Sequence, residues 1–223
     1  MKTAMPMLVA VVMQLFPCGW SRPLEAATVT FDVTINTAAL SGTAAQLAFD
    51  FIDGDGVANN TVTISAFAAP GATLGSPFAT GGVSGTLPGP VTLTDTTFFN
   101  ELLQPITLSN SLAFTLDVTT SFAGGVVPDA LSLFILDSAG LSSRVGTTDP
   151  TGSDALIRIG LVGSPNEVDA TVFHATTPTG AEVPITLSSR GTTTPVPEPS
   201  TLALLGGWCV LALWQEIRRR RPG

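Results

Sequence analysis

The stretch Thr28–Asn36, with the sequence TVTFDVTIN, alternates polar and apolar side chains at every position. In an extended chain its four apolar residues fall on one side and its polar residues on the other. This is the pattern of a β-strand with one buried and one solvated face. The stretch therefore predicts an antiparallel sheet that covers a core with one of its faces.

The same alternation recurs along the chain on both sides of this stretch. Further strands are predicted at residues 47–51, 62–64, 91–93, 106–108, 112–118, 131–136, 157–161 and 168–172. The run 131–136 is apolar on both faces, which indicates a central strand. Clusters of Gly, Pro, Asn and Asp separate the strands. Only Phe98–Gln104 could form a short helix, which Pro105 would end. The pattern predicts an all-β fold, an antiparallel β-sandwich of jelly-roll type.

The charge is distributed unevenly along the chain. The formal net charge is −8, and residues 27–194 hold only three basic residues against fourteen acidic ones. Phosphate contacts require Lys and Arg, so this composition excludes nucleic-acid binding by the body of the protein.

Rare residue types further limit the chemistry of the body. The chain has no Tyr, Lys2 is its only Lys and His174 its only His, and the two cysteines, Cys18 and Cys209, lie near the termini. The body therefore contains no disulfide, no thiolate nucleophile and no histidine pair for a metal. It must be stabilised by its core alone.

The N-terminus has the organisation of a secretory signal. Lys2 precedes an apolar run, Met5–Phe16, that is too short to span a bilayer, and small residues follow at Ala26 and Ala27. We expect residues 1–26 to be a signal peptide removed by signal peptidase. A short N-terminal membrane anchor is the alternative.

The C-terminus has three parts in a fixed order. A Thr/Pro linker, residues 191–196, leads to the triplet Pro197, Glu198 and Pro199. An apolar run follows, and the chain closes on the basic cluster Arg218, Arg219, Arg220 and Arg221. Leu202–Ile217 would be about 24 Å long as a helix, short for a hydrocarbon core of about 30 Å. We expect a short transmembrane helix with the arginines in the cytoplasm and the body outside.

This tail, residues 197–223, resembles the PEP-CTERM sorting signal of exported bacterial proteins. The resemblance is carried by residues 196–206 (VPEPSTLALLG) and the four arginines. It implies recognition by an exosortase, a membrane-embedded protease or transpeptidase. The enzyme would cut near Pro197, Glu198 and Pro199 and release the body, residues 27–190, to the cell surface or extracellular matrix. An ordinary anchor that is never cut is the alternative.

One acidic turn is a candidate metal site. Asp53 and Asp55 lie in the sequence DGDG, with Asp50 just before it, and carboxylates in a tight turn are the ligands that Ca²⁺ prefers. An EF-type loop fails, because Phe51 and Val62 would occupy its first and twelfth positions. A hairpin turn, for which Asp-Gly is well suited, is the favoured interpretation of residues 53–56, and a Ca²⁺ site is the alternative. No other cofactor is expected.

Catalytic signatures are weak. His174 has no second ligand or obvious triad partner, and no G-x-S-x-G motif occurs. Scattered carboxylates that converge in space leave a glycan-active enzyme open. A carbohydrate-binding module is the stronger rival, although sugar platforms usually employ Trp or Tyr. Phe98 and Phe99 are the only adjacent aromatic pair that could serve, and core packing is the favoured interpretation of both.

The sequence therefore predicts an exported, exosortase-processed surface or extracellular-matrix protein rather than an enzyme. Its expected role is structural or adhesive, within exopolysaccharide or a biofilm. Its expected partners are signal peptidase, an exosortase, the membrane before processing, and exopolysaccharide.

Overall fold

The computed structural model describes residues 27–121, 127–162 and 168–193. The predicted signal peptide, the PEP triplet, the transmembrane segment and the arginine cluster lie outside these residues. Among the described residues no helix is long and apolar enough to cross a membrane.

The described chain consists of β-strands and one 3-10 turn at Ala38–Leu40. The strands are β1 (Thr28–Asn36), β2 (Ala44–Ile52), β3 (Thr61–Ala68), β4 (Thr73–Leu74), β5 (Phe78–Thr80), β6 (Gly82–Gly85), β7 (Val91–Thr94), β8 (Phe99–Thr107), β9 (Ser111–Thr119), β10 (Ala130–Asp137), β11 (Gly146–Thr147), β12 (Ile157–Gly160), β13 (Asp169–Val172), β14 (Ala175–Thr176) and β15 (Ile185–Thr193).

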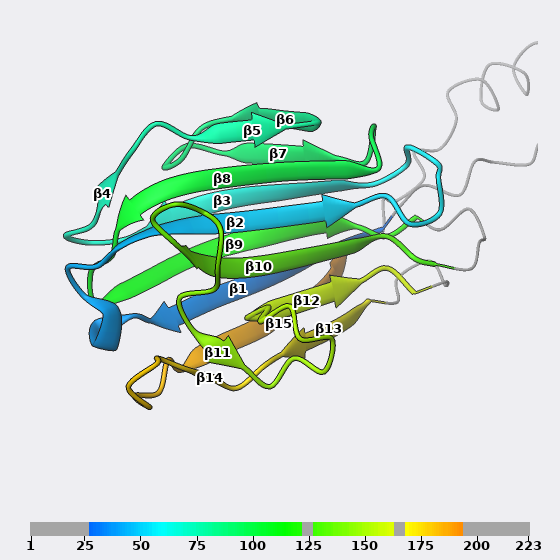
Figure 1. The fold of residues 1–223 in the computed structure, drawn as a ribbon. Helices are drawn as coiled ribbons and strands as arrows, with labels where there is room; N and C mark the ends of the chain where they lie inside the picture. Colours follow the sequence, from blue (N-terminus) through cyan, green and yellow to red (C-terminus); the bar gives the residue numbers. More distant parts are fainter. Residues whose placement is uncertain (1–26, 122–126, 163–167, 194–223) are drawn as a thin grey trace, which may run out of the picture.

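Two antiparallel sheets form the sandwich (Figure 1). Sheet A has the order β15-β1-β9-β3-β7-β6, and sheet B has the order β13-β12-β10-β2-β8-β4, with β5 also paired to β8. β11 and β14 make a small separate ribbon. The predicted all-β sandwich is confirmed, and the run 131–136 lies in the interior strand β10, as expected.

The long strands alternate between the two sheets along the chain. β1 belongs to sheet A, β2 to sheet B and β3 to sheet A again; β8, β9 and β10 repeat this alternation. The expected hairpin turn at residues 53–56 is therefore wrong. β2 and β3 lie in different sheets, so residues 53–60 form a crossover loop between the sheets rather than a turn within one.

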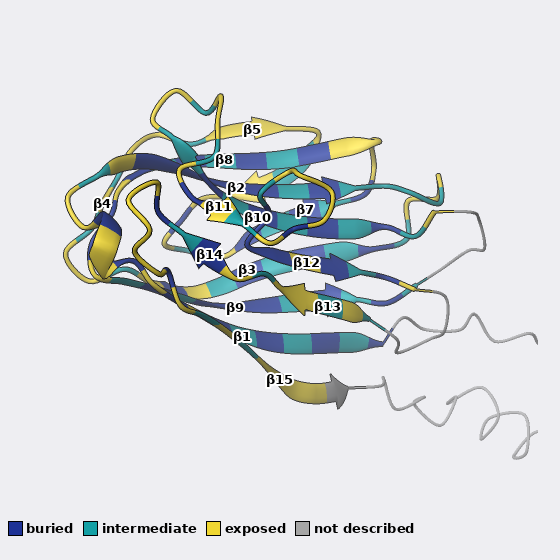
Figure 2. Ribbon diagram, turned by 60° about the horizontal axis from the view of Figure 1, so that its bottom comes forward, coloured by how far each residue is buried: buried dark blue, intermediate teal, exposed yellow. Residues whose placement is uncertain are grey.

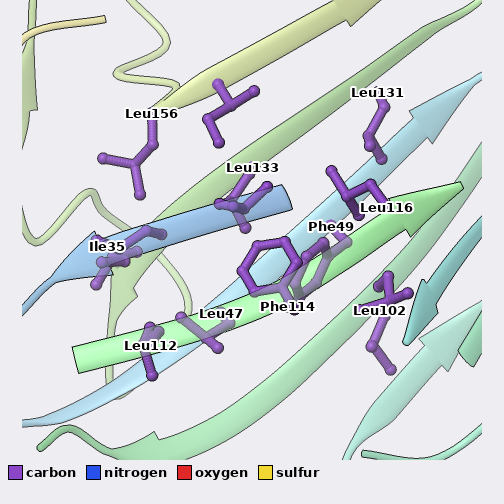
Figure 3. Packing of buried hydrophobic residues seen from close by; sticks show 14 of the residues in the cluster. Ile35, Leu47, Phe49, Leu102, Leu112, Phe114, Leu116, Leu131, Leu133 and Leu156 are labelled. Carbon is purple, nitrogen blue, oxygen red and sulfur yellow. The ribbon is translucent and has the colours of Figure 1, made fainter. Parts of the chain in front are cut away.

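The core lies between the sheets and follows the predicted alternation. In β1 the residues Val29, Phe31, Val33 and Ile35 are all at most 4 % exposed. Aromatic packing joins the sheets at the centre: Phe49 of sheet B meets Phe114 of sheet A edge-to-face, with ring centroids 5.5 Å apart. Figure 3 shows these two rings surrounded by leucines from both sheets. A third ring, that of Phe67, stacks on Phe114.

The predicted helix at Phe98–Gln104 is wrong. These residues belong to β8, which pairs with β2 over its whole length and buries every second side chain. Pro105 continues this strand instead of ending it. Its carbonyl accepts a bond from Gly75 at the outer edge of β8, between the segments that pair with β4 and β5. The missing N–H of Pro105 faces the same edge, so β2 loses no hydrogen bond.

The C-terminal strand β15 was not among the predicted strands, and it ends beyond residue 190, the predicted boundary of the body. β15 runs to Thr193 and pairs with β1 from Thr28↔Thr193 to Ile35↔Ile185, with a bulge at Thr30/Phe31. Pairing with β1 thus extends into residues 191–193, which the sequence assigned to the linker.

Candidate functional site

The two ends of the described chain lie side by side. Thr28 pairs with Thr193, so the segment that leads to the PEP triplet leaves the sandwich next to its first strand. The crossover loop 53–60 lies at the same end (Figure 1). We call this the terminal end of the sandwich.

Three carboxylates meet at the terminal end. Asp53, Asp55 and Asp129 offer oxygens that all lie within 4.8 Å of one another. Asp129 is buried, and its Oδ1 accepts bonds from the backbone N–H groups of Gly54 (2.8 Å) and Asp55 (3.2 Å). Sequence reasoning paired Asp53 and Asp55 with Asp50 and missed Asp129, which precedes β10. Asp50 instead lies within β2, on a different surface.

Asn60 connects this cluster to the neighbouring strands. It is fully buried, and its side-chain amide lies 2.7 Å from Oδ2 of Asp129 and 2.6 Å from the carbonyl of Ser121. Its Oδ1 accepts a bond from the N–H of Ser121 at 2.7 Å. A second buried carboxylate, Asp95, accepts the backbone N–H of Asn60 at 2.7 Å. Burial is the main cause that raises the pKa of Asp95.

The cluster satisfies part of what Ca²⁺ requires. Ca²⁺ takes roughly six to eight oxygen ligands, and three carboxylates at one loop supply an incomplete set. Both oxygens of Asp129 already accept hydrogen bonds, and Asp53 and Asp55 accept the N–H groups of Gly56 and Val57. These bonds hold the crossover loop in place, which accounts for the arrangement without a cation.

A second pair of carboxyls lies on the outer face of sheet B. Asp50 of β2 is directly opposite Glu101 of β8, and the two side chains are within hydrogen-bonding reach. Burial and the neighbouring Glu101 raise the pKa of Asp50 to about 7, and burial raises the pKa of Glu101 as well. Near pH 7 the Asp50 carboxyl is therefore protonated in part of the molecules, whereas an ordinary aspartate is ionised. Sequence reasoning missed the partnership, because register cannot be inferred from strand patterns alone.

The aromatic pair Phe98–Phe99 is not part of the core. Phe98 is 72 % exposed and Phe99 37 % exposed, which overturns the expected core packing of both. Phe98 immediately precedes β8, and its carbonyl accepts the N–H of Asp53. Phe78 of β5 is also exposed, at 66 %.

His174 lies in a shallow depression on the surface. Its Nε2 is 3.7 Å from an Oε1 of Glu182, and both side chains are more than half exposed. The residues that line the depression include no Ser, Thr or Cys. The arrangement offers a weak ion pair and no nucleophile for the histidine to activate.

Comparisons with known proteins identify the tail. A family model of the PEP-CTERM protein-sorting motif matches residues 195–221. The match spans the predicted triplet Pro197, Glu198 and Pro199 and the cluster Arg218–Arg221, and it confirms the resemblance. No curated protein and no solved structure matches the chain. The chain thus carries the signal of an exported protein that an exosortase sorts.

Proposed function

We propose that this PEP-CTERM protein, once processed, is a non-enzymatic structural or adhesive component of the cell surface or extracellular matrix. The observation that carries the proposal is the sorting motif at residues 195–221, directly behind an all-β body that ends at Thr193. Such a signal delivers a folded domain to the outside and then releases it from the membrane.

The outer face of sheet A supports this role. Thr28 and Thr30 of β1, Thr61 and Thr63 of β3, and Thr92 and Thr94 of β7 point away from the core. The hydroxyl of Thr30 donates to Asp117 at 2.6 Å, and a salt bridge joins Asp32 to Arg190. This face offers mainly uncharged hydroxyl groups, which suit a protein surrounded by hydrated polysaccharide.

The carboxyl geometry supports a non-enzymatic role. Glycoside hydrolases hold their two carboxyls about 5 Å or more apart, so that a sugar or a water fits between them. Asp50 and Glu101 are within hydrogen-bonding reach of each other, which leaves no such room.

Intact mass tests the sorting step. We would measure the mass of the native protein in membrane, periplasmic and extracellular fractions of its host. We expect a species that ends near Pro197 or Glu198, outside the inner membrane. A mass that still includes the arginine cluster, found only in the inner membrane, would make this an uncut anchored protein and contradict the proposal.

Replacing Pro197, Glu198 and Pro199 with Ala should leave the protein at its unprocessed mass in the inner membrane. Two prolines keep the triplet extended and accessible to a protease, because neither fits a helix interior. The matched control replaces Thr192, Thr193 and Thr194 with Ala and should be processed normally.

Deleting the gene tests the structural role. It should change cell aggregation or biofilm texture, whereas an unaltered matrix would count against this role.

A carbohydrate-binding module is the second candidate. The exposure of Phe98 at 72 % and of Phe99 at 37 % favours it, since two adjacent exposed aromatic rings can stack on the apolar face of a sugar. Retention on an immobilised glycan that is lost on Phe98→Ala or Phe99→Ala would support this candidate.

A further inference from the structure

The side chains of Phe78, Phe99 and Glu101 share the outer face of sheet B. Alternation along β8 buries Leu102 and turns Glu101 outward, together with Phe99 and Leu103. Directly opposite residues of an antiparallel pair lie on the same face. Phe78 of β5 is opposite Leu103, so Phe78 belongs to this face as well.

The two phenylalanines flank the carboxyl pair. Phe99 lies two residues before Glu101 along β8, and Phe78 lies beside the position two residues after it. At about 3.3 Å per residue the two rings are about 13 Å apart along the strand, the length of a short oligosaccharide. Figure 2 shows β5 and one end of β8 as exposed, next to the less exposed middle of β8.

The two carboxyls between the rings share a hydrogen bond, but one of their oxygens has no donor. Oδ1 of Asp50 is enclosed, and within the described residues no N–H or O–H group bonds to it. The polar groups in its own row are Glu101, Ser132 of β10 and Thr80 of β5, with Arg158 of β12 exposed beyond Ser132. Because Oδ1 of Asp50 is enclosed, the acceptor that a ligand hydroxyl can reach is the half-buried Glu101 beside it.

We propose that Phe78, Phe99 and the Asp50–Glu101 pair form a binding platform for a neutral polysaccharide chain. Sugar rings present apolar C–H faces to the phenylalanines, and their hydroxyls donate to the carboxyls between the rings. Phe lacks the polar atom that Trp or Tyr would bring, and the carboxyl pair supplies that function instead.

Charge complementarity decides between neutral and charged occupants. The body is acidic and this platform is centred on two carboxyls, so an anionic polymer is repelled. Asp50 is partly protonated near pH 7, so the pair carries less than its full charge and attracts a cationic polymer less strongly. Hydroxyl donors on an uncharged chain fit both the rings and the acceptors.

The proposal rests on the matrix role proposed above and names the surface that would perform it. The test uses the full chain in detergent and measures retention on cellulose and cross-linked dextran (neutral), alginate (anionic) and chitosan (cationic). We expect retention on at least one neutral polymer, and roughly tenfold weaker binding for the double variant Phe78→Ala/Phe99→Ala. Leu141→Ala, at a side chain 86 % exposed on a separate loop, is the matched control and should bind as the parent.

The carboxyl pair has a distinct signature. Asp50→Asn should weaken retention and at the same time raise the melting temperature at neutral pH, because the amide donates to Glu101 and the buried acid is removed. A purely structural pair would show a lowered melting temperature and unchanged retention.

Several outcomes would overturn the platform. They are the absence of retention on either neutral polymer, full retention by the double phenylalanine variant, or retention on chitosan alone. The matrix role fails separately, through an unprocessed mass or an unchanged biofilm, so the two failures can be told apart.

Discussion

At the scale of single residues, the terminal end depends on one buried amide. Asn60 contacts Asp129, Ser121 and the loop backbone at once. Each of these partners is a polar group that loses water on folding. The hydrogen-bonded Asn60 side chain is therefore expected to contribute more to the free energy of unfolding than a single exposed hydrogen bond does.

Asn60→Ala should lower the free energy of unfolding by about 3 kcal/mol, because it leaves a buried carboxylate oxygen and backbone groups without partners. Urea denaturation measures the change. The control is Asn36→Ala, an exposed residue whose Oδ1 accepts a single local bond from the N–H of Ala38, and it should cost less than 1 kcal/mol, as roughly one surface hydrogen bond does. Equal losses in the two variants would show that the Asn60 network contributes nothing special.

The Asp50–Glu101 pair predicts an unusual dependence of stability on pH. The native pKa of Asp50 is raised to about 7 from an ordinary value of 3.8. The native state therefore keeps a proton that the unfolded chain releases. The resulting stability is fully present below pH 4 and is lost as the pH rises to about 7.

Urea denaturation at pH 4.5 and pH 7.5 tests this dependence. We expect the parent to be more stable at the lower pH, by on the order of 2 kcal/mol. The raised pKa values of Glu101 and Asp95 act in the same direction. The pKa of Asp149 is lowered to about 2, so the stability that this carboxylate contributes is lost only as the pH falls below about 4. Asp50→Asn should flatten the profile, and a parent that is more stable at pH 7.5 would contradict the shared proton.

At the scale of strands and loops, the sequence pattern correctly predicted those features that depend only on neighbouring residues, such as single half-buried strands. The period-two alternation of residues 28–36 and 112–118 predicted β1 and β9, since a half-buried strand needs only its own sequence to show its faces. In β8 only the end was predicted as a strand, at 106–108, because residues 98–104 were assigned to a short helix ended by Pro105.

Sheet membership and the site residues needed information that single stretches lack. The loop at Asp53 was expected to be a hairpin because Asp-Gly favours turns, yet the pairings of β2 with β8 and of β3 with β9 place it between sheets. Asp129 lies 75 positions from Gly54, and Glu101 meets Asp50 only through register. Such contacts depend on the whole topology, so no local signal could have found them.

The crossover loop also yields a prediction about metal removal. Because hydrogen bonds already occupy the oxygens of Asp129, we expect the same melting temperature in EDTA and in millimolar Ca²⁺. A site filled at about 100 times its Kd would add about 2.7 kcal/mol, which a thermal scan detects easily. A rise in Ca²⁺ that disappears in Asp53→Asn/Asp55→Asn would establish the cation site and contradict this expectation.

At the scale of the whole molecule, the β-sandwich and the sorting motif occupy separate parts of the chain. All the residues of the hydrophobic core, including those packed on its margin, lie between Val29 and Leu187. The sorting motif begins at residue 195, beyond the last strand. A protease that cuts at the motif therefore removes none of the described strands and none of the residues of the described hydrophobic cluster.

Two truncations of the mature chain test this separation. A chain of residues 27–194 keeps β15 and should melt at the same temperature as the full chain, because the core and both sheets are complete. A chain of residues 27–184 loses β15, its eight-residue pairing with β1, and the side chains of Ile185 and Leu187 that pack on the core. The exposed edge of β1 would then be free to pair with other chains, so we expect a much lower melting temperature and aggregation. If 27–184 were as stable as 27–194, β15 would add nothing to the domain, and the linker would begin before residue 191, where the sequence placed it. If 27–194 failed to fold, the tail would be part of the domain, and release by an exosortase would destroy the protein that it delivers.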